Sequence, residues 1–251
     1  MKKRIIARID VKNEYAIKGI HLEGLRKIGN PNELALKYYL KGIDEIIFMD
    51  AVASYYDRNS LSNIIEIATK NIYVPITVGG GIRSLEDIQI ALNSGADKVS
   101  INTEAVKNPK FIYESAKKFG SQCIIGSIEA KITDNNEWKV FYDNGREKSD
   151  IDVISWAKKL QELGAGELLI TSIDMEGTRR GFDVELSEKI AESVTIPVIS
   201  SGGAGDTNHI LNLFEKTNID GVALASILHY NIFSVEEIKK TLKENKIPVR
   251  K

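Results

Sequence analysis

Short apolar runs rich in β-branched residues alternate along this chain with longer segments in which apolar residues recur three and four positions apart. Runs of the first kind are typical of buried parallel strands, and segments of the second kind are typical of amphipathic helices. The strand-like runs are Arg4–Asp10, Glu45–Asp50, Val74–Val78, Asp97–Ile101, Cys123–Glu129, Glu167–Ser172, Pro197–Ser201 and Asp220–Ala225. This regular alternation predicts an α/β fold, a single (β/α)8 TIM barrel domain over residues 1–251.

The predicted helices carry start and stop signals at the expected places. Ser84 precedes the helical segment Leu85–Asn93, and Asp206 precedes another, so each side chain can cap the first N–H groups of a helix. Gly95 and Gly164 follow helical segments, where glycine readily adopts the left-handed conformation that ends a helix. These signals place helices between the strand-like runs, as a barrel requires.

The two halves of the chain, about 1–120 and 121–251, are alike at the ends of equivalent strands. The matching pairs are IDVK at 9–12 with IEAK at 128–131, VGGGI at 78–82 with SGGAG at 201–205, and Asp50 with Asp174. The members of each pair lie about 120 residues apart, which predicts a duplicated half-barrel with four βα units in each half. A polar insertion at 132–150 adds turn signals at 135–136 and 143–145, so we expect a β-hairpin flap there.

The charge and the cysteine content exclude several classes of protein. The 34 basic and 35 acidic side chains leave a net charge of −1, which argues against nucleic acid or a membrane surface as a partner. The one cysteine, Cys123, cannot form an internal disulfide, and no apolar run is long enough for a membrane span, so we expect a cytoplasmic protein. His21, His209 and His229 lack the spacing of metal ligands, so we expect no metal and no cofactor.

Two carboxylates end opposite strands of the predicted barrel. Asp10 ends the first strand-like run and Glu129 ends the fifth, so both side chains should lie at the C-terminal mouth where such barrels build active sites. A single carboxylate at such a place more often caps a helix or pairs with a lysine such as Lys12 or Lys131. The symmetric pair favours a division of acid and base duties instead.

Two glycine-rich loops, VGGGI at 78–82 and SGGAG at 201–205, each follow a strand and precede a helix. One such loop is weak evidence, since glycine also serves tight turns. Two loops at equivalent places, with Asn102-Thr103 and Ala225-Ser226 nearby, predict two phosphate sites built from backbone N–H groups. The expected substrate therefore carries a phosphate at each end.

A set of charged residues begins four strands at the opposite end of the barrel. Any one of them is more simply explained as a solvated strand end. Together they predict a ring of alternating charge that closes the barrel floor as a plug or gate. The members are Arg4, Glu45, Lys98 and Glu167.

These motifs resemble the cyclase subunit of imidazole glycerol phosphate synthase, a family of histidine biosynthesis. The matching segments are RIIARIDVK, KG at 18–19, GIDEIIFMDA, VGGGIRS, GADKVSINTEAV, FGSQ, GAGELLITSID, GTRRGFD and SGGAG, which run essentially from end to end. The resemblance implies a barrel that takes ammonia from a separate glutaminase docked at its N-terminal face. It also implies a reaction in which a ribulosyl-formimino-carboxamide ribotide is cyclised and split into imidazole glycerol phosphate and aminoimidazole carboxamide ribotide.

The resemblance also implies roles for individual residues. Asp10 matches the general base, Glu129 stands at the second catalytic carboxylate, and Lys18 matches a substrate-contacting lysine. Arg4, Glu45, Lys98 and Glu167 match the ammonia gate. The positions that match the two phosphate sites are Gly81, Asn102 and Thr103 for one, and Gly177, Gly203, Ala225 and Ser226 for the other, with Thr171 beside them.

Three positions depart from the family's pattern, and all three belong to the part of the site where the reaction is expected to occur. Glu129 and Glu176 replace aspartates, and Arg8 replaces a cysteine that faces inward below the base. A glutamate moves the acid by about 1 Å, which can cost about a hundredfold in rate. Strand alternation points Arg8 the same way as Asp10, where a fixed cation should depress the pKa of Asp10 and could obstruct an ammonia path.

These departures leave alternatives to cyclase activity. One is an ammonia-conducting barrel that serves a sugar amidotransferase in surface-polysaccharide biosynthesis and has lost or altered its own chemistry. Another is the sugar-phosphate isomerase that shares this half-barrel design. The charged floor ring argues against the isomerase, because an enzyme that uses no ammonia needs no gate.

Overall fold

A computed structural model describes residues 2–53 and 61–250. Parallel strands form a closed barrel at its centre, because the last barrel strand pairs with the first and the last strand of the first half-barrel pairs with the first strand of the second. In order round the barrel the strands are β1 (Arg4–Lys12), β4 (Glu45–Asp50), β5 (Ile76–Gly79), β6 (Lys98–Ile101), β7 (Ile124–Ile132), β10 (Glu167–Ser172), β11 (Val198–Ser201) and β12 (Gly221–Leu224). The predicted (β/α)8 barrel is confirmed.

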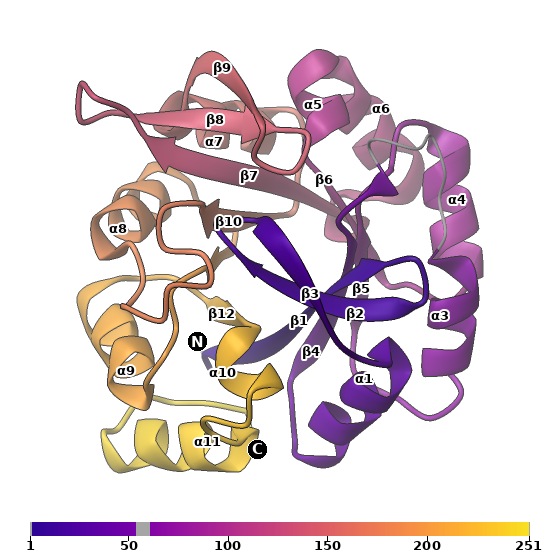
Figure 1. The fold of residues 1–251 in the computed structure, drawn as a ribbon. Helices are drawn as coiled ribbons and strands as arrows, with labels where there is room; N and C mark the ends of the chain where they lie inside the picture. Colours follow the sequence, from indigo (N-terminus) through magenta and orange to yellow (C-terminus); the bar gives the residue numbers. More distant parts are fainter. Residues whose placement is uncertain (1, 54–60, 251) are drawn as a thin grey trace.

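Helices surround the barrel (Figure 1). They are α1 (Pro31–Leu40), α3 (Ser62–Ala68), α4 (Leu85–Asn93), α5 (Thr103–Lys107), α6 (Lys110–Phe119), α7 (Val153–Glu162), α8 (Val184–Ser193), α9 (Thr207–Lys216), α10 (Ser226–His229) and α11 (Val235–Glu244), with a 3-10 turn η1 at Ser121–Cys123. Their apolar faces pack on the outer faces of the strands and form the main core. Within the described ranges, no helix combines the length and the apolar character that a membrane span needs.

The predicted helix signals are confirmed by the local geometry. Ser84 begins α4 with a reciprocal capping box, in which its hydroxyl accepts from the Asp87 N–H and the Asp87 carboxylate accepts in return. Asp206 caps α9 by accepting from the Asn208 N–H over 2.7 Å. Gly95, with φ of 107°, ends α4 as expected.

The inside of the barrel is layered along its axis. Residues at even positions of β1 point inward, so Arg4, Ile6, Arg8 and Asp10 follow one another from floor to mouth. A small apolar cluster separates the charged floor from the mouth, and it consists of Ile6, Ile47, Ile125, Leu169, Ile199 and Ala223 with Met49 against it. The chemistry of the mouth is therefore insulated from the charges of the floor.

The predicted flap is confirmed as an extension of β7. Strand β8 (Trp138–Tyr142) pairs antiparallel with β7, and β9 (Glu147–Asp152) pairs with β8. The turn between β8 and β9 contains Asp143, Asn144 and Gly145, all with positive φ, as its sequence indicated. This turn reaches back over the mouth next to Glu129.

A second hairpin, which the local sequence pattern did not predict, follows β1. Strand β2 (Tyr15–Ile20) pairs antiparallel with β1, and β3 (Glu23–Gly29) pairs with β2. The turn residues His21 and Leu22 have φ of 53° and 63°, a conformation that usually selects glycine, asparagine or aspartate. The hairpin was missed because its turn lacks those residues. It lies across the opening of the barrel in Figure 1.

Candidate active site

Asp10 and Glu129 both lie buried inside the mouth of the barrel. Asp10 comes from β1 and Glu129 from β7, and three barrel strands separate β1 from β7 on either side. The two carboxylates therefore approach the mouth from opposite walls. Their protonation is linked, because the charge of Asp10 raises the pKa of Glu129.

Asp10 is held as a carboxylate by its cationic neighbours. Burial opposes its ionisation, but the Arg8 guanidinium and the Lys18 ammonium outweigh burial, so the pKa of Asp10 lies below its usual value. The closest contact is a hydrogen bond of 2.8 Å from Arg8 Nε to Asp10 Oδ1. Asp10 is thus negatively charged at any ordinary working pH.

The pKa of Glu129 is shifted in the opposite direction, above its usual value. Burial raises its pKa to about 7, although the charge of Arg8 and the Gly145 N–H, 2.7 Å from Glu129 Oε2, act in the other direction. A neighbouring charge, Asp143 on the flap, raises the pKa further. Near neutral pH the mouth therefore contains one fixed carboxylate and one carboxyl group that can gain or lose its proton, which is the arrangement that acid–base catalysis needs.

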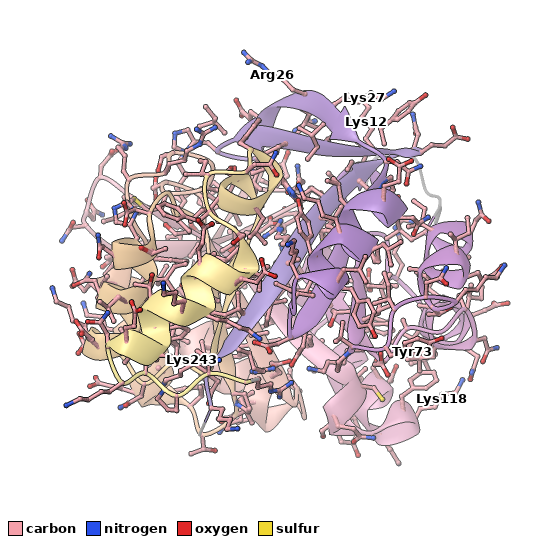
Figure 2. All side chains as sticks on the ribbon, turned by 90° about the horizontal axis from the view of Figure 1, so that it is seen from below. Lys12, Arg26, Lys27, Tyr73, Lys118 and Lys243 are labelled. Carbon is pink, nitrogen blue, oxygen red and sulfur yellow. The ribbon has the colours of Figure 1, made fainter. Side chains whose placement is uncertain are left out.

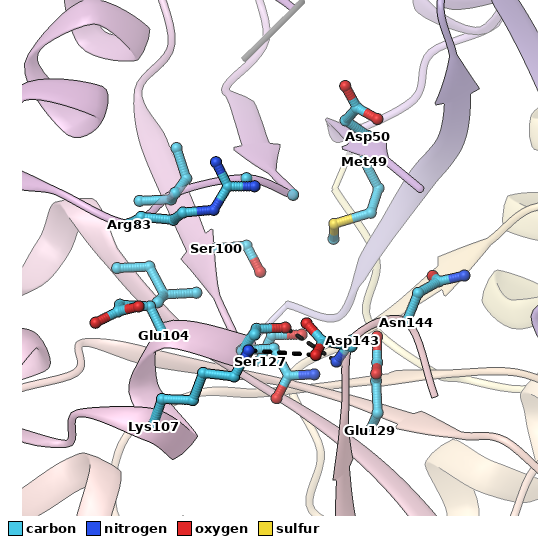
Figure 3. Close-up of a pocket in the computed structure, with 16 residues that line it drawn as sticks. Met49, Asp50, Arg83, Ser100, Glu104, Lys107, Ser127, Glu129, Asp143 and Asn144 are labelled. Atoms are coloured by element: carbon cyan, nitrogen blue, oxygen red, sulfur yellow. Dashed lines mark hydrogen bonds and ion pairs between the residues drawn. The ribbon is translucent and has the colours of Figure 1, made fainter. Parts of the chain in front are cut away.

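The first predicted phosphate site lies in a cavity of about 250 Å³ that Glu129 also lines (Figure 3). Gly81, Asn102 and Thr103 are all on its wall, so the structure brings these three predicted residues together. Asn102 Oδ1 is buried, and the described residues provide it with no hydrogen-bond partner. Because an amide oxygen only accepts hydrogen bonds, a molecule that satisfies it must supply an N–H or O–H group.

Two cations on this cavity were missed by the sequence analysis. Arg83 follows the glycine-rich loop directly, and Lys107 lies one helical turn after Thr103. Both side chains line the cavity in Figure 3, where Lys107 also pairs with Asp143 at 3.3 Å. Both could have been predicted from their positions, because Arg83 comes one position after a glycine-rich loop and Lys107 comes one helical turn after a predicted phosphate-binding residue.

The second predicted phosphate site is a smaller cavity on the other side of the mouth. Gly177, Gly203, Ala225 and Ser226 all line it, and so does Lys18. Arg8 reaches this cavity from inside the barrel.

Thr171 does not line the second cavity. It is buried, and its Oγ1 accepts a hydrogen bond of 2.9 Å from Arg8 Nη1. Thr171 pairs in register with Ser201, which does line the cavity, so it lies beside the wall and not on it. Its place beside a phosphate site stays a prediction.

Lys18 is buried on β2 and forms an ion pair with Glu176. Burial lowers the pKa of Lys18 to about 8, against the charge of Asp10, which raises it. Glu176 also accepts from the Leu22 N–H over 2.9 Å, and its carbonyl accepts from the His21 N–H over 3.0 Å. Glu176 thereby holds the tip of the β2–β3 hairpin against the loop after β10, and it also lines the second cavity.

The charged residues at the floor form one alternating ring. Arg4 Nη1 lies 3.0 Å from Glu45 Oε1, and Arg4 Nη2 lies 2.5 Å from Glu167 Oε1. Lys98 Nζ closes the ring with contacts of 3.1 Å to Glu45 Oε2 and 2.9 Å to Glu167 Oε2. Arg250, which the sequence analysis did not include, approaches Glu45 from the C-terminal segment at 3.6 Å.

Arg4→Met should destabilise the fold, because it leaves two buried carboxylates with less compensating charge. We expect the free energy of unfolding in urea to fall by roughly 3–5 kcal/mol. Lys189→Met, which breaks the exposed ion pair with Glu185 on α8, is the control and should change it by less than about 1 kcal/mol. Equal small effects would show that the ring contributes little to stability.

Comparison with known proteins places this site in a family. The model of a family described as histidine biosynthesis protein matches residues 4–234. The imidazole glycerol phosphate synthase subunit HisF of Legionella pneumophila is 57% identical over 202 residues, which cover 80% of this chain and 95% of that protein. The same subunit of Hydrogenobaculum sp. is 46% identical, and that of Bacillus cereus strain G9842 is 44% identical, each over 100% of this chain and 99% of the relative. The chain therefore belongs to the HisF family, the cyclase subunits of imidazole glycerol phosphate synthase.

Proposed function

We propose that the chain cyclises and splits the ribulosyl-formimino-carboxamide ribotide with ammonia, as a cytoplasmic cyclase subunit. The observation that carries this function is that two buried carboxylates, Asp10 and Glu129, approach the mouth from opposite walls. Glu129 lines the first cavity, and Arg8, which donates to Asp10, lines the second. The names of the relatives also favour cyclase activity over the ammonia-conducting barrel that serves a sugar amidotransferase.

In this proposal Asp10 is the general base and Glu129 is the general acid. Asp10 is ionised and can accept a proton, whereas Glu129 near neutral pH can donate one to a departing nitrogen. Ring closure and cleavage of the carbon–nitrogen bond both require such transfers. Lys18 lies beside Asp10 and on the wall of the second cavity, so it would contact the substrate between the base and a phosphate.

The two cavities would hold the two phosphates of the substrate. Gly81, Asn102 and Thr103, with the cations Arg83 and Lys107, would bind one of them. Gly177, Gly203, Ala225 and Ser226 would bind the other, next to Lys18. A substrate bound at both ends is stretched across the mouth between Asp10 and Glu129.

Gly203→Ala should weaken binding of the substrate. Gly203 has φ of 103°, and an added Cβ would lie 1.8 Å from the Gly181 carbonyl oxygen, so the second cavity must deform. We expect the Kd, measured by calorimetry without ammonia, to rise about tenfold or more. Gly42→Ala is the control, since Gly42 also has positive φ but faces open space, and it should bind substrate normally. Unchanged binding by Gly203→Ala would remove the second cavity from the substrate site.

Ammonia would enter through the floor. The proposed gate is the ring of Arg4, Glu45, Lys98 and Glu167, and a separate glutaminase subunit would dock on the N-terminal face that surrounds it. Exposed apolar side chains on that face fit a protein partner, because Leu40 is 72% exposed and Tyr73 is 78% exposed. Figure 2 shows Tyr73 at the end of the molecule opposite Arg26 and Lys27 of the β2–β3 hairpin.

Tyr73→Glu should weaken docking of the glutaminase subunit and leave ammonium-driven turnover unchanged. An added charge at the core of an interface typically costs more than 1 kcal/mol, so we expect the Kd of the two subunits to rise about tenfold. Tyr113→Glu on α6 is the control, because Tyr113 is also an exposed tyrosine, at 49%, but lies on the side of the barrel. An equal effect of both variants would argue against this docking face.

The proposed function is tested by supplying the ribotide and an ammonium salt to the purified chain from neutral to mildly alkaline pH. Free ammonia bypasses the glutaminase, so turnover reports the chemistry of the barrel alone. We expect imidazole glycerol phosphate and aminoimidazole carboxamide ribotide in equal amounts. Tight binding of the ribotide without any turnover would contradict the proposal.

A further inference from the structure

Arg8 is a buried cation inside the barrel, two residues before Asp10 on the same face of β1. Its Nε donates to Asp10 Oδ1 over 2.8 Å, and its Nη1 donates to Thr171 Oγ1 on β10 over 2.9 Å. Nη1 also lies 3.5 Å from the hydroxyl of Ser201, at the end of β11. One side chain therefore connects Asp10 on the first strand to two strands of the second half-barrel.

Burial of the Arg8 side chain costs free energy that must be compensated by a partner. A guanidinium buried at this depth loses its hydration, and the floor carboxylates cannot compensate it because the apolar cluster around Ile6 lies between them. Within the described ranges, Asp10 is the carboxylate that forms an ion pair with Arg8. The two charges therefore depend on each other.

We infer that Arg8 is a positioning residue for the proposed reaction, which fixes the direction of the Asp10 carboxylate and supplies the buried positive charge that faces it. This inference rests on the proposed function, in which Asp10 is the base. Arg8 acts through Asp10 by orienting it from the side, with its other nitrogen anchored on Thr171. The guanidinium cannot lose its proton in a protein, so its effect persists at every working pH.

The other charged groups around Asp10 cannot replace Arg8. Lys18 on β2 is paired with Glu176, and its pKa of about 8 means that it loses charge in mildly alkaline solution. His229 on α10 is neutral near pH 7, because burial lowers its pKa to about 4. Glu129 on β7 adds no positive charge. Arg8 is therefore the neighbour of Asp10 that stays cationic over the whole working range.

The first test is a direct titration of Asp10 that does not depend on turnover. Aspartate labelled with ¹³C at the side-chain carboxyl is followed by NMR as a function of pH, and Asp10→Asn assigns the signal. In Arg8→Met we expect the midpoint of Asp10 to move upward by about 1–3 pH units, because an uncharged side chain of similar length no longer favours the carboxylate. An unmoved midpoint would overturn the inference, whether or not the chain turns over the ribotide.

The second test separates charge from orientation in ammonium-driven turnover. Arg8→Met should move the acidic limb of the kcat profile to higher pH, because more of Asp10 is then protonated. Arg8→Lys and Thr171→Val keep a cation beside Asp10 but lose the anchored geometry, so they should lower kcat with the limb nearly in place. A purely structural role predicts equal losses in all three variants with no movement of the limb, and that result would contradict the inference. If Arg8→Met does not fold, Arg8→Lys and Thr171→Val still test orientation by this comparison.

Discussion

Asp10→Asn is expected to lower turnover of the ribotide by a factor of about 10² to 10⁴, the range that a positioned general base contributes. An amide cannot accept the proton, although its oxygen can still accept the hydrogen bond from Arg8 Nε. Substrate binding should be largely intact, because both phosphate cavities are built from other residues. The measurement is kcat with ammonium salt, combined with calorimetric binding of the ribotide in the absence of ammonia.

Asp174→Asn is the matched control for this variant. Asp174 follows β10 near the mouth, but its carboxylate is occupied by a hydrogen bond of 2.8 Å from the Ile132 N–H. We expect its turnover to stay close to that of the unaltered chain. Loss of ribotide binding in Asp10→Asn, or turnover as fast as in Asp174→Asn, would count against Asp10 as the base. A thermal melt of both variants excludes loss of fold as the cause.

Glu129 should make kcat depend on pH, with kcat lower at higher pH. The acid must be protonated, and its pKa is about 7, so kcat at a fixed concentration of free ammonia should fall as the pH rises through about 7. Glu129→Gln should lower kcat about a hundredfold or more and abolish this fall. The amide keeps the size of the side chain and can still accept the hydrogen bond from the Gly145 N–H.

The control for Glu129 is another carboxylate on the same cavity. Asp143 lies on the flap and pairs with Lys107 at 3.3 Å. Asp143→Asn should keep the fall of kcat but move it to slightly lower pH, because the charge of Asp143 raises the pKa of Glu129. A profile that rises through pH 7 in the unaltered chain would show that Glu129 acts as a base. An alkaline limb that persists in Glu129→Gln would assign the titration to another group.

The glutamate at position 129 also shows what the structure adds to the sequence. By side-chain length alone, glutamate in place of aspartate is expected to misplace the acid. In the structure Glu129 Oε2 meets the Gly145 N–H at 2.7 Å, so the flap holds the longer side chain in a defined place. The longer side chain of glutamate is therefore accommodated by a hydrogen bond from a turn that lies 16 residues further along the chain.

Local patterns in the sequence predicted the barrel, the caps of α4 and α9 and the β8–β9 flap. Each depends on a short-range rule, such as runs of β-branched residues, an N-cap such as Ser84, or a turn with asparagine and glycine at 143–145. The β2–β3 hairpin could not be predicted in this way, because its His21-Leu22 turn is held by Glu176, which lies far away in the sequence.

The chemistry of the site was predictable only in part for the same reason. Alternation along β1 placed Arg8 and Asp10 on one face, and their contact is confirmed at 2.8 Å. The bond from Arg8 to Thr171 spans the barrel, and no local rule relates residues so far apart in the chain. The protonation of Glu129 depends likewise on burial by the closed mouth, which only the folded chain provides.

We propose that this barrel builds ammonia into an imidazole ring. To test this, the purified chain is supplied with the ribotide and an ¹⁵N-labelled ammonium salt, and both products are analysed by mass spectrometry. We expect one ¹⁵N atom in imidazole glycerol phosphate, none in the aminoimidazole carboxamide ribotide, and loss of both products in Asp10→Asn. Unlabelled products, or ribotide recovered intact from a chain that binds it, would show that the barrel does not carry out this reaction.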